Sequence, residues 1–341
     1  MKGNCEVKGL ETIRERTENR EKEFLSAFAA LSCETKGRKR EEPPCEIRTA
    51  YQRDRDRIIH CPAFRRLKHK TQVFLAPERD HYRTRLTHTL EVSQIARTIA
   101  RALQLNEDLT EAVALGHDLG HTPFGHAGER ALDRCYSEGF RHYEQSVRVV
   151  ELLEKHGAGL NLTREVIDGI RCHTKGQAAE TWEGRVVRIA DKIAYMNHDI
   201  DDAIRAGILK ETEIPPHILG RLGSSKSERI SIMIGSVIEG SGEDIAMTPD
   251  IAEVFTLLHT FLFDTVYIHK EAKGEEHKAE SLIVSLFEHY TKKPEELPAE
   301  FKKIIETEGV ARAACDYIAG MTDRYAVYTY QNLFVPKAWD I

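Results

Sequence analysis

Between Arg83 and Glu129 the sequence combines imidazole and carboxylate side chains within a segment that otherwise has the pattern of packed helix. Its centre is the apolar string AVALGHDLGH, which contains the doublet His117–Asp118. A charged side chain is costly to bury there unless it is paired or bound to a metal. A lone histidine on an apolar face is usually a core residue, but imidazole and carboxylate together suit a divalent cation. The doublet therefore predicts a metal site.

Two more residues of ligand type stand far from the doublet in the sequence. His88 lies on the preceding predicted helix, and Asp191 lies on a much later one. Three or four protein ligands leave positions on a six-coordinate ion for water and substrate. Such open positions are typical of a catalytic metal rather than a structural one.

Helical spacing of apolar residues predicts the elements that must position these side chains, over roughly 84–105, from 107 to an end near 116–120, and over 184–206. Asn106 is the expected N-cap of the second helix, and two acidic residues follow it near the positive end. Pro123 breaks the chain after the doublet, and a helix restarts near Gly125. Because no sustained alternation of Val, Ile and Thr is present, we predict an all-α protein.

Length and composition describe an ordinary globular chain of one large domain or two. It has 341 residues, of which 41% are hydrophobic and 30% charged, with a net charge of −6. That charge argues against a generally basic nucleic-acid binder. No apolar run is long enough for a membrane span, and the N-terminus lacks the apolar region of a signal peptide. Seven scattered cysteines without a CxxC pair indicate reduced thiols, so we expect a cytoplasmic protein.

Two local features admit more than one interpretation. Residues 48–74 are rich in Arg and Lys, which is typical of a solvated helix face but also of a site that binds a polyanion beside the metal. Cys172 next to His173 has the form of a ligand pair, although a buried structural cysteine is the commoner case.

Four blocks of the sequence resemble a known family. They are YQRDRDRIIHCPAFRRLKHKTQVF, HYRTRLTHTLEVSQIARTIARAL, ALGHDLGHTPFGHAGE and CDYIAGMTDRYA. The order His, His-Asp, distant Asp resembles the HD-domain metal-dependent phosphohydrolase superfamily. The four blocks together resemble the deoxyguanosine triphosphate triphosphohydrolase-like proteins over roughly residues 45–335. This implies an HD-domain helical bundle with additional N- and C-terminal helices: an N-terminal helix and linker (1–45), a phosphohydrolase core (46–210) and a C-terminal helical region packed on it (211–341).

The resemblance also implies a reaction, in which a deoxynucleoside triphosphate (dNTP) and water give a deoxynucleoside and tripolyphosphate. The implied cofactor is a divalent metal ion, with Mn²⁺ or Mg²⁺ ahead of Fe, Ni or Zn. It would polarise the α-phosphate and make a bound water more acidic. The implied metal ligands are His88, His117, Asp118 and Asp191. The implied catalytic residues are His126, paired with Glu129, and His121.

Substrate contacts follow from the same resemblance. Arg85 and Lys192 would offset the charge of the triphosphate. Tyr195 and Asp199 follow Asp191 at helical spacing and would reach along the sugar. Gln72 matches a deoxyribose contact, and His142 matches a residue that faces the α-phosphate. A homo-oligomer and a dNTP activator at a second site are also implied, whereas a single-stranded DNA partner has no support from the net charge.

Other functions remain open on the sequence. One alternative is another HD phosphohydrolase, such as a nucleoside monophosphate phosphatase or a cyclic-nucleotide phosphodiesterase. A second is a nucleotide or single-stranded nucleic-acid sensor without turnover, although the complete set of ligands counts against it. The block 315–326 is expected near the site or at a subunit interface, and the preferred base cannot be deduced.

Overall fold

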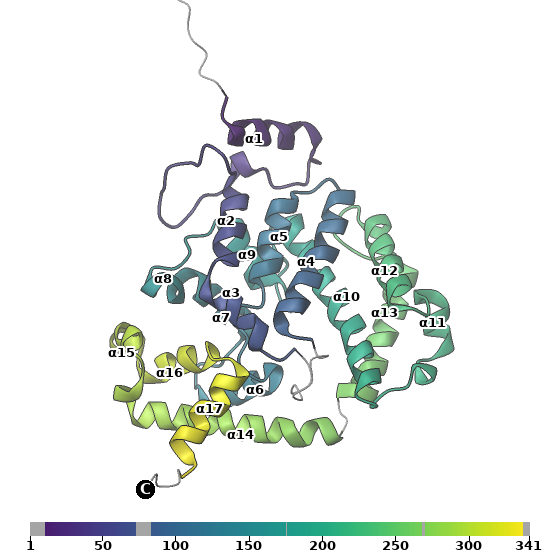
Figure 1. The fold of residues 1–341 in the computed structure, drawn as a ribbon. Coiled ribbons are helices and arrows are strands. Elements are labelled where there is room, and N and C mark those ends of the chain that lie inside the picture. Colours follow the sequence, from purple (N-terminus) through teal and green to yellow (C-terminus); the bar gives the residue numbers. More distant parts are fainter. Residues whose placement is uncertain (1–10, 73–82, 175, 268–269, 337–341) are drawn as a thin grey trace, which may run out of the picture.

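The computed structural model describes residues 11–72, 83–174, 176–267 and 270–336. In these ranges the chain forms helices, with a long connection over 25–49, and no strand is present beyond two isolated bridges (Figure 1). The prediction of an all-α protein is confirmed. None of the described helices is both long and apolar enough to cross a membrane.

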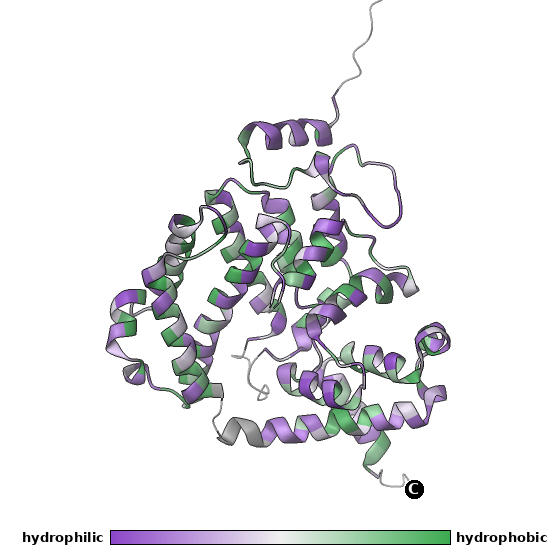
Figure 2. Ribbon diagram, turned by 180° about the vertical axis from the view of Figure 1, so that it is seen from behind, coloured by the Kyte–Doolittle hydropathy of each residue, from purple (hydrophilic) through white to green (hydrophobic). Residues whose placement is uncertain are grey.

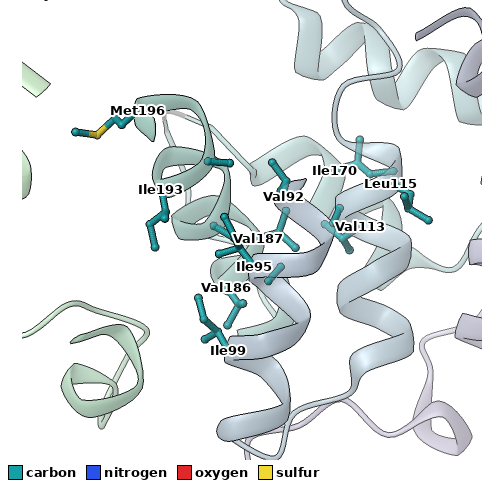
Figure 3. Close-up of a cluster of buried hydrophobic side chains, with 14 of the residues drawn as sticks. Val92, Ile95, Ile99, Val113, Leu115, Ile170, Val186, Val187, Ile193 and Met196 are labelled. Carbon is teal, nitrogen blue, oxygen red and sulfur yellow. The ribbon is translucent and has the colours of Figure 1, made fainter. Parts of the chain in front are cut away.

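Helix α5 (Glu107–Gly116) lies at the centre of the larger of two apolar cores. It packs against α2 (Ala50–Ile59), α4 (Arg85–Ala102), α9 (Arg164–Cys172) and α10 (Trp182–Arg205). Asn106 caps α5 as predicted, since its side chain accepts a hydrogen bond from the Leu109 amide. Figure 3 shows apolar side chains from these helices meeting between α4, α5 and α10, and all of them are nearly inaccessible to solvent.

The chain after residue 210 divides between the two cores. Helices α11 (Pro216–Leu222), α12 (Lys226–Gly240) and α13 (Pro249–Leu262) complete the first core beside α10. Helices α14 (Lys270–Lys292), α15 (Lys302–Glu308), α16 (Val310–Ala319) and α17 (Asp323–Phe334) build a second core together with α6 (Gly125–Cys135). The predicted boundaries at 45 and 210 remain predictions.

The remaining helices are short or peripheral. Helix α1 (Ile13–Phe24) lies at one end of the molecule and is mostly hydrophilic, whereas hydrophobic residues line the inner faces of the central helices (Figure 2). Helix α7 (His142–Arg148) runs into a π-helical turn (Val149–Leu153) and the short α8 (Glu154–Gly157). The other short elements are α3 (Pro62–Arg66), a π-helical turn (Phe263–Tyr267) and 3₁₀ turns at Ser32–Glu34, Leu67–His69, Glu211–Glu213, Pro294–Glu296 and Ala299–Phe301.

Candidate metal centre

Four predicted ligands from three separate segments converge between α4, α5 and α10. His88 Nε2 lies 3.1 Å from Asp191 Oδ1 and 3.7 Å from Asp118 Oδ2. His117 Nε2 lies 3.3 Å from Asp118 Oδ1 and 3.9 Å from Asp191 Oδ1. His88, His117 and Asp118 are buried, and Asp191 is partly exposed. The opening beside Asp191 therefore leaves one side of the group accessible.

His117 is oriented by the end of its own helix. Helix α5 stops at Gly116, and the ring nitrogen Nδ1 of His117 lies 2.6 Å from the Ala114 carbonyl oxygen. Since a carbonyl oxygen only accepts, Nδ1 carries the proton and Nε2 of the neutral ring is bare. This buried Nε2 faces the two aspartates and has no hydrogen-bond partner in the described part of the chain.

His88 is oriented by the side chain of His198 on α10, which is itself held by Glu91. Its Nδ1 lies 3.4 Å from Nδ1 of His198, whose Nε2 lies 2.5 Å from Glu91 Oε2. Burial lowers the pKa of His198 to about 4, so this ring is neutral at pH 7. Its one proton is on the nitrogen that faces the Glu91 carboxylate, and its Nδ1 is an acceptor for His88. His88 Nε2 is then bare as well.

Four electron-pair donors therefore meet without a proton among them. Two bare imidazole nitrogens face two carboxylates at 3.1–3.9 Å, and Arg85 offsets the charge of only one of these carboxylates, Asp118. A further cation between the groups would relieve their remaining repulsion. Nitrogen and carboxylate oxygen are ligands that Zn²⁺ and other first-row divalent ions accept. The residues present thus fit a divalent metal, and its identity remains a prediction.

Arg85 lies inside the site rather than at its mouth. Its guanidinium donates to Asp118 Oδ2 at 2.7 Å and to the carbonyl oxygens of Thr71 and Gln72, and the residue is 2% exposed. Burial raises the pKa of Asp118, but His117, His121 and Arg85 outweigh it and hold that pKa well below its usual range. Arg85 therefore orients a ligand in this structure, and its predicted phosphate contact stays a prediction.

A second group of side chains lies beside Asp118 and brings together the predicted catalytic residues. Glu129 on α6 accepts hydrogen bonds from the backbone amide and Nδ1 of His142, both at 2.9 Å. His126 Nδ1 also approaches Glu129, at 3.3 Å, but the His126 side chain is 70% exposed. The His121 ring stacks on His142 at 4.0 Å, and its Nε2 lies 3.2 Å from Asp118. The closest imidazole partner of Glu129 is thus His142 rather than His126.

Glycine is required where this second group meets the metal ligands. A Cβ on Gly120 would lie 2.1 Å from the Ser146 backbone nitrogen and 2.5 Å from the His142 carbonyl oxygen. The turn after His117–Asp118 therefore packs directly on the backbone of α7, and this contact sets His121 against His142.

Two functional candidates, His198 and Glu91, were missed in the sequence, and a third, His173, was considered there only as a possible ligand pair with Cys172. His173 lies close to His117 and Asp191, donates from Nδ1 to the Ile170 carbonyl oxygen at 2.7 Å and presents Nε2 toward the site. His198 and Glu91 orient His88 as described above. Spacing was the available signal, because Glu91 follows His88 by one helical turn and His198 follows Asp191 by two.

The predicted substrate residues lie at different depths. On α10, Lys192 is exposed, Tyr195 is half-buried and Asp199 is buried. Burial raises the pKa of Tyr195, so its hydroxyl is protonated at neutral pH. Gln72 is half-buried, and its side-chain oxygen is a buried acceptor with no partner among the residues that the structure describes. Their contacts with substrate remain predictions.

The arginines of the basic stretch are largely engaged within the protein. Arg53 and Arg57 pair with Glu42, and Arg55 pairs with Asp108. Lys70 is buried and donates to the His121 and Ala319 carbonyl oxygens. On α2 these contacts fit neither a simple solvated face nor a free polyanion site.

The block 315–326 packs near the site. Asp323 accepts from the backbone amides of Thr71 and Phe124, and thereby ties α17 to the segments on either side of the metal ligands. Asp316 is buried and accepts from Gln145 and Arg148.

Two family models and several known proteins match the chain. A model of the HD domain matches residues 85–196, and a model of the phosphohydrolase-associated domain matches residues 245–332. A deoxyguanosinetriphosphate triphosphohydrolase-like protein of Caldanaerobacter subterraneus subsp. tengcongensis is 56% identical over 96% of this chain and 97% of that protein. A protein of the same description from Clostridium perfringens is 50% identical over 95% and 98%. A phosphohydrolase structure from Bacteroides thetaiotaomicron VPI-5482 covers 82% of this chain and 68% of that chain, with a TM-score of 0.53 at 18% identity, and supports the fold alone.

Proposed function

Because the chain belongs to the deoxyguanosinetriphosphate triphosphohydrolase-like proteins, we propose that it is a metal-dependent hydrolase that converts a dNTP and water into a deoxynucleoside and tripolyphosphate. The observation that carries this proposal is the convergence of two bare imidazole nitrogens and two carboxylates on one point. His88, His117, Asp118 and Asp191 would hold the ion. A bound divalent ion supplies Lewis acidity at the α-phosphate and acidifies a water ligand.

The protein's own residues hold this donor set in place. Arg85 fixes Asp118 through a buried charge-assisted hydrogen bond of 2.7 Å. The Ala114 carbonyl fixes the tautomer of His117. Such preorganisation means that no side chain has to reorient when substrate charge develops.

Proton transfer is the second task, because the departing 5′-oxygen must gain a proton. Burial raises the pKa of Glu129, but hydrogen bonds from His126 and His142 outweigh it and keep that pKa far below 7, so Glu129 is an anion. It orients His142 and has His126 within reach, and either ring then carries a proton toward the substrate. General acid–base help of this kind is worth about 10²–10⁴-fold.

The remaining parts of the proposal follow the family resemblance. Lys192 on α10 is exposed beside Asp191 and is suited to a phosphate, with Tyr195 and Asp199 one and two turns further on. A homo-oligomer, a cytoplasmic location and activation by a second dNTP belong to the same proposal.

Product analysis tests the reaction most simply. The chain is incubated with each dNTP, singly and in pairs, with Mn²⁺ or Mg²⁺. After the metal is removed, phosphorus NMR identifies the phosphate product and reversed-phase chromatography identifies the nucleoside. Tripolyphosphate and deoxynucleoside in equal amounts support the proposal. Orthophosphate, a monophosphate or the opening of a cyclic nucleotide instead would identify a different HD phosphohydrolase, and no metal-dependent turnover would favour a sensor.

A further inference from the structure

The two imidazoles of the candidate metal centre are oriented in different ways. His117 donates to a carbonyl oxygen of its own helix, three residues earlier. His88 has no such backbone partner, and its Nδ1 instead faces the side chain of His198. The tautomer of His117 is thus set by its own helix, whereas that of His88 depends on side chains from two helices.

We propose that Glu91 and His198 are positioning residues for the metal centre, which hold His88 in the tautomer that binds a cation. The Glu91 carboxylate fixes the proton of His198 on Nε2. The bare Nδ1 of His198 then accepts from His88, whose Nε2 lone pair points at Asp118 and Asp191. This inference rests on the proposed function only in taking His88 as a metal ligand.

This Glu91–His198–His88 relay consists of one short contact and one longer contact. Glu91 Oε2 lies 2.5 Å from His198 Nε2, and the two Nδ1 atoms of His198 and His88 are 3.4 Å apart. The rings meet edge to face, with centroids 5.4 Å apart and an interplanar angle of 85°. Both histidines are 1% exposed, so water has little access to the contact between their rings, whereas the Glu91 side chain is 35% exposed.

The packing of two helices builds this arrangement. Helix α4 carries His88 and, one turn later, Glu91; helix α10 carries Asp191 and, two turns later, His198. Each helix therefore supplies one ligand and one residue of the relay, and α4 packs against α10. A hydrogen bond from the second nitrogen of a ligating histidine typically raises metal affinity about 10–100-fold.

A purely structural role for Glu91 is the competing explanation, because Glu91 also contacts Arg83 at 3.1 Å and Lys226 at 3.4 Å. Both cations have Asp201 as a further partner, at 3.6 Å and 3.4 Å. They therefore keep a carboxylate when Glu91 is replaced. Lys226→Met removes a Glu91 ion pair without touching His198 and serves as the matched control.

The test is calorimetric titration of the metal-free full chain with Mn²⁺ alone. We expect Glu91→Leu and His198→Leu to weaken Mn²⁺ binding about 10–100-fold, and Lys226→Met to bind like the wild type. In His198→Asn the amide oxygen can replace Nδ1 as the acceptor, so we expect affinity within about threefold of wild type. Adding Glu91→Gln to His198→Asn should then change nothing, because the Asn acceptor no longer needs Glu91.

Two ligand variants separate failure of the relay from failure of the proposed function. If His88→Ala and His117→Ala weaken Mn²⁺ binding while the Glu91 and His198 variants do not, the relay is wrong and the metal centre stands. If His88→Ala and His117→Ala bind Mn²⁺ as the wild type does, both are wrong. Circular dichroism verifies folding, and if His198→Leu is unfolded, Glu91→Leu against the Lys226→Met control decides the question.

Discussion

The two sides of the candidate site are supported by different cores. The metal ligands lie on α4, α10 and the end of α5, which pack in the first apolar core. Glu129 lies on α6, which packs with α14 in the second. The Glu129–His142 hydrogen bond and the contacts of Lys70 and Asp323 join the two sides. Cation binding thus depends on the first core, whereas Glu129 depends on the second, although its partner His142 lies on α7, which packs against α9 in the first. Glu129 can therefore be altered without changing the helices that carry the metal ligands.

Removal of a ligand from the first side should have the largest effect. His117→Ala deletes a buried nitrogen donor, and loss of a catalytic cation costs several kcal/mol of transition-state stabilisation, or about 10³-fold or more in kcat. Steady-state hydrolysis and a Mn²⁺ titration measure the two consequences. His217→Ala on α11, where the histidine is exposed, is the control. Normal turnover by His117→Ala would show that hydrolysis does not require a metal bound by His117.

Replacement of the acid on the second side should spare the metal. Glu129→Gln keeps the shape but removes the anion that orients His142, so we expect kcat to fall about 10²–10⁴-fold. Mn²⁺ affinity should equal that of the wild type, because Glu129 touches none of the four ligands. An equal loss of metal binding would show that the two sides do not act separately.

Two histidines on the second side can be ranked. His142 is half-buried and lies 2.9 Å from Glu129, whereas His126 is 3.3 Å away and mostly exposed. An imidazole held by a buried anion is the better oriented donor, so His142→Ala should lower kcat at least about tenfold more than His126→Ala. A larger loss in His126→Ala than in His142→Ala in single-turnover assays would favour the His126–Glu129 pair that the sequence motif suggests.

Thiol labelling probes the two cores without altering the site. Cys61 lies in the first core and Cys315 in the second, and burial raises the pKa of these thiols to about 11 and about 12. Cys45 lies outside both cores, and hydrogen bonds from the Arg48 and Ile47 amides lower its pKa to about 7. Cys45 should therefore react with a disulfide reagent above pH 7, and more slowly as the pH falls through 7. Mass spectrometry identifies the labelled residue, and early labelling of Cys315 would indicate that the second core opens readily.

Sequence and structure agree best where the information is local. The all-α class, the cap at Asn106 and the restart at Gly125 follow from periodicity and turn chemistry, and the fold is confirmed. The convergence of His88, His117, Asp118 and Asp191 was expected from residue types and family resemblance. Their roles stay predictions.

Tertiary partners were out of reach of the sequence. Nothing near Arg85 in the chain shows that its guanidinium turns to Asp118. His198 was overlooked, and His173 was considered only as a partner of Cys172, because a buried histidine is ordinarily a core residue whose hydrogen-bond partners appear only when the helices pack. For the same reason the ion pairs of the basic stretch could not be anticipated.

Anomalous diffraction from crystals soaked in Mn²⁺ is the most direct test of whether the four predicted ligands bind one divalent ion. If these four residues bind the ion, one strong peak will lie about 2.0–2.4 Å from Nε2 of His88, Nε2 of His117 and one oxygen each of Asp118 and Asp191. A peak confined to the neighbouring group of His121 and His142, or no peak among these four residues, would contradict it.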